Sequence, residues 1–110
     1  MPVKEGDPVA IVAVSISPVG EGVSVGDHVT EALRVLRSQS RVRFELGPMF
    51  TTLEGDLREI FDLILRMQEA VFAKGAMRVG TVIKVDERRD RTAHMEDKVR
   101  RVERALADSN

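Results

Sequence analysis

The sequence predicts an α+β fold whose elements follow the order strand, helix, strand, strand, helix, strand, with an extra C-terminal helix. Strands are recognised by β-branched residues with a period of two, and helices by apolar residues that recur every three or four positions. The chain has 110 residues, of which 43% are hydrophobic and 32% charged, so one core of ordinary size accounts for it. We expect a single domain over residues 1–110, with a flexible N-terminus over 1–8 and a frayed end over 107–110.

The first two elements are expected to be a central strand and an amphipathic helix. Residues 9–16 are apolar at odd and even positions alike, which is typical of a strand with both faces covered. A loop rich in Pro and Gly follows, and Ser24 is placed to cap the next helix. The apolar residues of this helix recur at helical spacing and are Val29, Ala32, Leu33 and Leu36.

Two extended segments come next. Apolar residues alternate with charged ones over residues 42–46, which predicts a half-buried strand in a peripheral position. Gly47 and Pro48 interrupt this pattern, and the threonines within residues 49–54 favour another extended segment. The two segments form either a tight hairpin or one strand bent by a bulge, and we expect the hairpin.

The strongest helical pattern runs from Asp56, as its N-cap, to Gly75 at its C-terminal end. Its apolar residues are Leu57, Ile60, Phe61, Ile64, Leu65, Val71 and Phe72. We expect Phe61, Met67 and Phe72 to lie in the core, because apolar residues of an amphipathic helix usually pack there.

The remaining chain is expected to form one strand and one helix. Residues 77–85 return to strand chemistry, and residues 86–91 are predicted to be a charged loop. Thr92 is placed to cap the last helix. The narrow apolar seam of this helix consists of Val99, Val102 and Leu106.

This order corresponds to the split βαβ arrangement of a ferredoxin-like βαββαβ sandwich. Right-handed crossovers place both helices on one face of the sheet and leave the other face open. One parity of the apolar first strand must lie on that open face, either the even-numbered residues Ala10, Val12, Val14 and Ile16 or the residues between them. Exposed apolar faces mark interfaces. We therefore expect a homo-oligomer in which the open faces, the third helix or both cover one another.

Composition argues against several kinds of partner. The net charge is −1 and the pI about 6.1, so no overall field attracts nucleic acid or an anionic membrane surface. The chain has no Cys, and His28 and His94 are not at the spacing of metal ligands. No apolar segment reaches the roughly 20 residues that span a bilayer, and residues 1–8 lack the apolar run of a signal peptide. We expect a soluble, cytoplasmic protein without metal or cofactor and with no nucleic-acid or membrane partner.

Residues 47–55 hold polar groups that packing does not require, namely Thr51, Thr52 and Glu54. The nearby carboxylates at positions 54, 56, 59 and 62 would suit an acid–base pair, but helix N-termini favour acidic residues in any case. Glu54 is the carboxylate that this effect explains least, because it lies on or just after the strand. An enzyme that uses Glu54 with Asp86 or Arg88 is thus one alternative. Two others are a small-molecule-sensing regulatory module of the same fold and a structural assembly protein with no ligand.

Short motifs distributed over nearly the whole chain match one family pattern. They are Ser17-Pro18-Val19-Gly20 after the first strand, the helix start at Ser24, Gly47-Pro48-Met49 with Thr51 and Glu54-Gly55, Glu69-Ala70-Val71, Arg78-Val79, Ile83-Lys84-Val85-Asp86 and Arg88-Arg89-Asp90. On these residues the chain resembles the small thiamine-binding protein family, long catalogued as a domain of unknown function and related to proteins that bind thiamine and its hydroxymethylpyrimidine moiety. Two positions differ, because Phe50 stands where the family usually has Gly and Gly26 where it often has Ser.

The resemblance implies a ferredoxin-like fold, dimers that commonly pair into tetramers, and binding of a thiamine-like molecule without catalysis. An aminopyrimidine needs hydrogen bonds along one edge and apolar contact on its face, and the thiazolium ring is a cation. Candidate residues are Ser15, Ser17 and Thr51 for the hydrogen bonds, Met49 or Phe50 for the ring face, and Glu54 or Asp86 for the cation. Structural roles are the alternative: Ser15 and Thr51 could bond the backbone, and Glu54 could cap the second helix.

Overall fold

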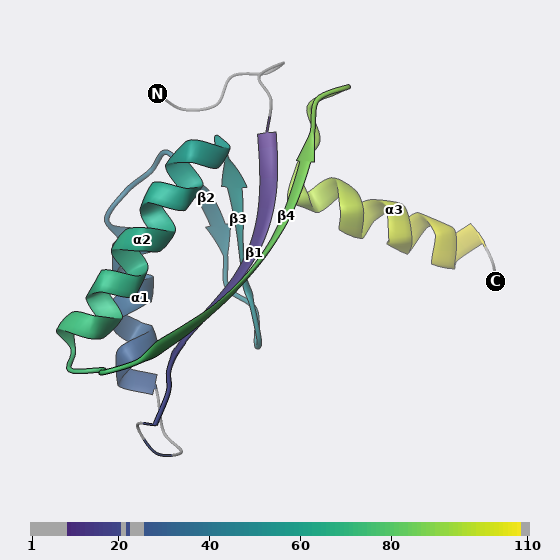
Figure 1. Ribbon diagram of the computed structural model, residues 1–110. Helices are drawn as coiled ribbons and strands as arrows, with labels where there is room; N and C mark the ends of the chain where they lie inside the picture. The colour runs from purple at the N-terminus through teal and green to yellow at the C-terminus, as the bar shows by residue number, and fades with distance from the viewer. Residues whose placement is uncertain (1–8, 21, 23–25, 109–110) are drawn as a thin grey trace.

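The computed structural model describes residues 9–20, 22 and 26–108 and confirms the expected α+β, ferredoxin-like fold with its extra C-terminal helix (Figure 1). The elements are β1 (Val9–Pro18), α1 (Gly26–Arg37), β2 (Arg43–Glu45), β3 (Thr51–Gly55), α2 (Leu57–Ala73), β4 (Val79–Arg88) and α3 (Met95–Asp108). The N-terminal segment 1–8 and the proposed cap at Ser24 lie outside the described residues.

The strands form one antiparallel sheet in the order β2-β3-β1-β4, so β1 is central and β2 and β4 are the edges. The strands β2 and β3 pair as the expected hairpin. Helices α1 and α2 lie side by side on one face of the sheet, as right-handed crossovers require (Figure 1). The opposite face is not covered by either helix.

The parity of β1 decides which residues form the core. Its even-numbered residues from Ala10 to Ile16 are buried, while Ile11, Ala13, Ser15 and Ser17 are half-buried on the open face. Val12 lies opposite Leu53 of β3, and both side chains are fully buried. Burial of each such side chain contributes about 1.5–3 kcal/mol, so this layer under the helices is the main source of stability.

The expectation that Phe61 and Phe72 lie in the core is wrong, because both are 39% exposed. The buried stripe of α2 consists of Ile60, Leu63, Ile64, Met67 and Val71. Phe61 and Phe72 are each one position beyond a member of this stripe, so the helical rotation of 100° per residue turns them away from the sheet centre. Met67 is buried as expected.

Two boundaries near the C-terminus also differ from expectation. Strand β4 continues to Arg88, so residues 86–88 are strand and not loop. Their backbone pairs with β1 as far as Val9, and their charged side chains are tolerated because β4 is an edge. Helix α3 begins at Met95, so Thr92 lies too far upstream to be its N-cap. His94 takes the N-cap position, since its N–H donates to the Asp97 carboxylate (2.9 Å) and its carbonyl accepts from the Asp97 N–H.

Helix α3 projects from the open side of the sheet and leaves α1 and α2 on the other side (Figure 1). Its seam residues Val99 and Val102 are 57% and 58% exposed. Over the described part of the chain, no helix combines the length and apolar character needed to cross a membrane.

Candidate functional site

A cavity of about 290 Å³ lies where β1 extends beyond the start of β3, and we call it the β1 cavity. Its polar lining residues are Ser15, Ser17 and Thr51, and its apolar walls include Leu33 of α1 and Met67 of α2. None of the described lining residues is Asp, Glu, His, Lys or Arg. Cavities for drug-sized ligands begin at about 300 Å³, so the β1 cavity suits one substituted ring.

The strand ladder ends at this cavity. Strand β1 pairs with β4 along its whole length, but its pairing with β3 stops at Val14 opposite Thr51. Among the described residues, no strand therefore pairs with the β3 side of β1 over residues 15–18. A free strand edge offers backbone N–H and C=O groups, which a planar heterocycle can use as hydrogen-bond partners.

Three hydroxyl groups accompany this free edge. Ser15, Ser17 and Thr51 are half-buried, and within the described part of the chain their hydroxyls form no hydrogen bond with other protein groups. The alternative that the Ser15 and Thr51 hydroxyls hydrogen-bond to the backbone is therefore wrong for the described residues. Thr51 lies opposite Val14 on the helix-covered face, whereas Ser15 and Ser17 have the parity of the open face, so the hydroxyls flank the free edge from its two sides. A ligand at this edge could use them as donors or acceptors.

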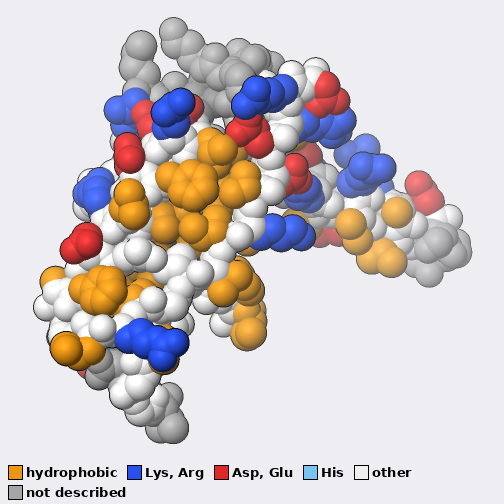
Figure 2. Space-filling view, in the orientation of Figure 1, with side chains coloured by type: hydrophobic (Ala, Val, Ile, Leu, Met, Phe, Trp, Pro, Cys, Tyr) orange, Lys and Arg blue, Asp and Glu red, His pale blue; other side chains and the backbone are white. Residues whose placement is uncertain are grey.

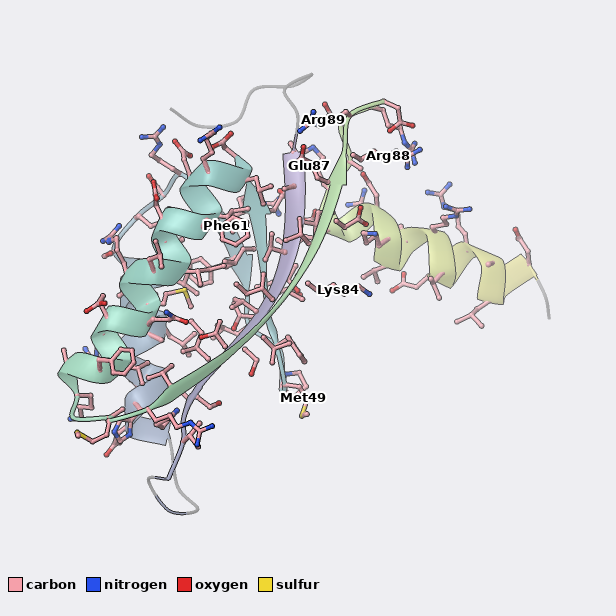
Figure 3. All side chains as sticks on the ribbon, viewed as in Figure 1. Met49, Phe61, Lys84, Glu87, Arg88 and Arg89 are labelled. Atoms are coloured by element: carbon pink, nitrogen blue, oxygen red, sulfur yellow. The ribbon has the colours of Figure 1, made fainter. Side chains whose placement is uncertain are left out.

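The turn between β2 and β3 forms one wall of the cavity. Met49 projects from this turn, lines the cavity and is 79% exposed (Figure 3). Gly47 is required by close approach, since a Cβ atom there would lie 2.4 Å from the carbonyl oxygen of Phe50. The Phe50 side chain is 38% exposed and is not among the lining residues of the cavity. Of the two candidates for apolar contact, Met49 is thus the one at the cavity.

Glu54 lies elsewhere and holds α3 against the sheet. It is 4% exposed, and its Oε1 atom accepts a hydrogen bond from the N–H of Met95 at 2.8 Å. Its Oε2 atom accepts from Nη1 of Arg43 at 2.7 Å. Nδ1 of His94 is 3.2 Å from Oε1 but lacks the geometry of a hydrogen bond. Glu54 therefore caps the third helix and not the second, whose cap is Asp56.

Asp86 also takes part in holding α3. Its carboxylate accepts a hydrogen bond from Lys98, which lowers the pKa of Asp86 below its ordinary value. On the other side of α3, Arg43 donates to Glu96; this bond lowers the pKa of Glu96 and raises that of Arg43. The first turn of α3 is thus fixed by charged contacts to both β2 and β4.

A second cavity of about 420 Å³ lies between α3 and the open face, and we call it the α3 groove. Its lining includes Ile11, Glu45, Asp86 and Val99. Leu46 and Gly47 line both the α3 groove and the β1 cavity, so the two are neighbours on either side of this segment.

The structure thus brings together four of the proposed site residues, Ser15, Ser17, Met49 and Thr51, at one cavity. It places Glu54 and Asp86 at the base of α3, and Phe50 next to the cavity wall. The sequence interpretation missed the walls that the helices provide, namely Val29, Ala32, Leu33 and Met67. Their helical spacing was the available signal, but the same spacing describes ordinary core residues. Among the described residues, no group of three or more His, Cys, Asp or Glu could hold a metal ion.

The fold and the site define an α+β sandwich with a small, uncharged cavity at the end of its central strand ladder. The chain belongs to the thiamine-binding protein family, whose model matches residues 12–103. It is 40% identical over 103 residues to a UPF0045 protein of Staphylococcus xylosus, covering 90% of this chain and 96% of that one. A UPF0045 protein of Mycobacterium bovis is 46% identical over 97 residues, with 87% and 93% covered.

Solved structures agree with this assignment. The hypothetical protein MJ1052 of Methanocaldococcus jannaschii superimposes with a TM-score of 0.78 at 33% identity, covering 86% of this chain and 95% of that one. A domain of unknown function, DUF77, from Bacillus cereus gives a TM-score of 0.74 at 35% identity, with 83% and 86% covered. Family membership supports a thiamine-related role for this chain.

Proposed function

We propose that this protein binds thiamine or its hydroxymethylpyrimidine moiety without catalysing a reaction, and that the β1 cavity is the binding site. One observation carries the proposal: Ser15, Ser17 and Thr51 present hydroxyls without protein partners beside the free edge of β1, and Met49 lies next to them. An aminopyrimidine has donors and acceptors along one edge and apolar faces. The cavity offers groups that match both properties.

The character of the cavity favours the pyrimidine as the part that is enclosed. Its described lining has no charged side chain, so a phosphate or a thiazolium cation inside it would lose hydration without gaining a charged partner. The thiazolium half of thiamine would therefore lie outside, beyond Leu46 and Gly47. Glu45 lines the α3 groove on that side and forms no ion pair with the described residues, so its carboxylate is a suitable neighbour for the cation.

The same lining supports binding rather than catalysis. General acid–base catalysis needs a titratable group within hydrogen-bond reach of the reacting atom, and the described lining contributes only hydroxyls and backbone. Glu54 and Asp86, which an enzyme hypothesis would use, are hydrogen-bonded to α3. We therefore propose a binding protein and not an enzyme. As a separate proposal, we place it in the cytoplasm.

We also propose that the protein acts as a homo-oligomer, a dimer of dimers. The open face and the seam of α3 support this, since Val99 and Val102 expose more than half of their surface. Light scattering at micromolar concentration measures the mass, and a monomer would contradict the proposal.

Isothermal titration with hydroxymethylpyrimidine and with thiamine tests the binding function. Thr51→Val keeps the shape of the side chain and removes the hydroxyl in the β1 cavity, so we expect the Kd to rise roughly tenfold, as loss of one hydrogen bond implies. Thr52→Val is the matched control, because Thr52 is the next residue and lines the α3 groove instead. Equal effects of the two substitutions would contradict the location of the site. The absence of any heat of binding with either compound would contradict the proposal that they are ligands.

A further inference from the structure

Another cavity, of about 360 Å³, lies between the C-terminal end of β4 and one face of α3, and we call it the basic cavity. Its lining residues Asp97, Lys98 and Arg101 recur at spacings of three and four residues, so they share one face of α3. Arg88 lines it from β4, and Figure 3 shows Arg88 on the α3 side of this strand. Figure 2 shows Lys and Arg side chains gathered where β4 ends and α3 begins. The basic cavity thus collects charged groups that the β1 cavity does not use.

The carboxylates that line the basic cavity already have partners. Asp86 accepts a hydrogen bond from Lys98. Glu87 accepts from Nε of Arg89 at 2.6 Å. Asp97 accepts from a backbone N–H at the start of α3, as described above. These three carboxylates are therefore not free to neutralise a further cation at the cavity.

Two of the cations that line the cavity are left over. Arg88 pairs with Asp90, with 2.9 Å between Nη2 and Oδ2, and Lys98 is engaged by Asp86. Arg91 and Arg101 also line the cavity, and both form no ion pair with any residue that the structure describes. A guanidinium group presents its N–H donors in a planar fork that matches two oxygens of a phosphate. Two such forks at one cavity are a suitable arrangement for a dianion.

The basic cavity is separate from the β1 cavity. Val9 lines the first and Ser17 lines the second, and these residues are about 26 Å apart along β1 at the usual rise of a strand. The α3 groove lies next to the basic cavity, because both are lined by Ile11, Asp86 and Lys98. A molecule held in the basic cavity therefore has room to extend into the α3 groove.

We propose that the basic cavity binds a phosphoryl group, held by the guanidinium groups of Arg91 and Arg101. A phosphoryl group carries a charge between about −1.5 and −2 at pH 7, which matches two unpaired guanidinium groups, whereas a carboxylate would leave one of them unpaired. Inorganic phosphate and phosphate monoesters share this chemistry. A monoester would place its organic part in the α3 groove. This site is independent of the thiamine-related function proposed above.

Isothermal titration with inorganic phosphate, in a buffer without other phosphate, tests the site. Arg101→Gln removes one of the two guanidinium groups from an exposed position, so the fold should persist while the Kd for phosphate rises roughly tenfold or more. Arg104→Gln is the matched control, because Arg104 is exposed, unpaired among the described residues and on the same helix, but does not line the cavity. We expect its Kd to equal that of the natural chain. Equal effects of the two substitutions would overturn the proposal.

Titration with phenyl phosphate and with acetate identifies the ligand more closely. Tighter binding of phenyl phosphate than of inorganic phosphate would support the site and indicate a monoester that reaches the α3 groove. Equal affinity would support the site and indicate free phosphate. The absence of binding with both phosphates, or acetate binding as tightly as phosphate, would overturn the proposal. Hydroxymethylpyrimidine should bind to Arg101→Gln with the Kd of the natural chain, so a failure of this proposal is distinguishable from a failure of the proposed function.

Discussion

Replacement of Glu54 tests the role that the structure gives it, which is to hold α3 and not a ligand. Glu54 is 4% exposed and accepts hydrogen bonds from the N–H of Met95 and from Arg43. Glu54→Ala removes both acceptors and the charge near the N-terminus of α3. Glu54→Gln removes the charge but keeps an oxygen that the Met95 N–H can reach.

The expected cost follows from these contacts. In Glu54→Ala the N–H of the buried Met95 loses its partner, which costs about 1–3 kcal/mol. The Arg43 contact contributes less than about 1 kcal/mol, since the Arg43 side chain is 53% exposed and retains Glu96. We expect a loss of about 2–3 kcal/mol in the free energy of unfolding for Glu54→Ala and about 1 kcal/mol for Glu54→Gln.

Urea unfolding at one fixed protein concentration measures these losses, and hydrogen exchange of the Met95 amide reports whether the first turn of α3 has opened. Titration with hydroxymethylpyrimidine provides the second readout, and we expect the Kd of Glu54→Gln to match that of the natural chain. If Glu54→Ala were as stable as the natural chain, the anchoring role would be refuted. If Glu54→Gln folded normally but lost binding, Glu54 would belong to the ligand site after all.

Three further changes have defined outcomes. Gly47→Ala forces a Cβ atom against a carbonyl 2.4 Å away, so we expect weaker ligand binding in titration, and unchanged binding would contradict the wall assigned to this turn. Asp56→Ala removes the cap of α2 and should lower the free energy of unfolding in urea by about 1 kcal/mol. An unchanged midpoint would contradict the capping role of Asp56. Arg43 lowers the pKa of Glu96, so this pair stabilises above the ordinary Glu pKa and is lost as pH falls through the lowered value. Glu96→Gln should therefore make the free energy of unfolding depend less on pH on the acid side. A pH dependence parallel to that of the natural chain would contradict this.

The strands and helices were predictable because each has a local pattern. The two-sided apolar character of β1 and the caps of α2 are visible in consecutive residues, and so is the polar excess at Thr51. The role of Glu54 was not predictable, because its partner Met95 is 41 residues away and no local pattern connects them. Phe61 was assigned to the core for a related reason, since only the position of the sheet decides which of two adjacent helical stripes is covered.

The residues of the β1 cavity also fall into two groups, those that the sequence could predict and those that it could not. Thr51 was identifiable as a polar residue that packing did not require, and Ser15 and Met49 became candidates through the family resemblance and the chemistry of thiamine. The α1 wall, including Leu33, was not separable from an ordinary core stripe, because its shape depends on where β3 begins relative to β1. Sequence therefore indicates which residues are unusual, while the space between them depends on long-range register.

A crystal structure of the protein with bound hydroxymethylpyrimidine tests the central claim most directly. We expect the ring in the β1 cavity, hydrogen-bonded to the free edge of β1 and the Thr51 hydroxyl and in contact with Met49. Ordered ligand in the α3 groove, with the β1 cavity empty, would contradict the account.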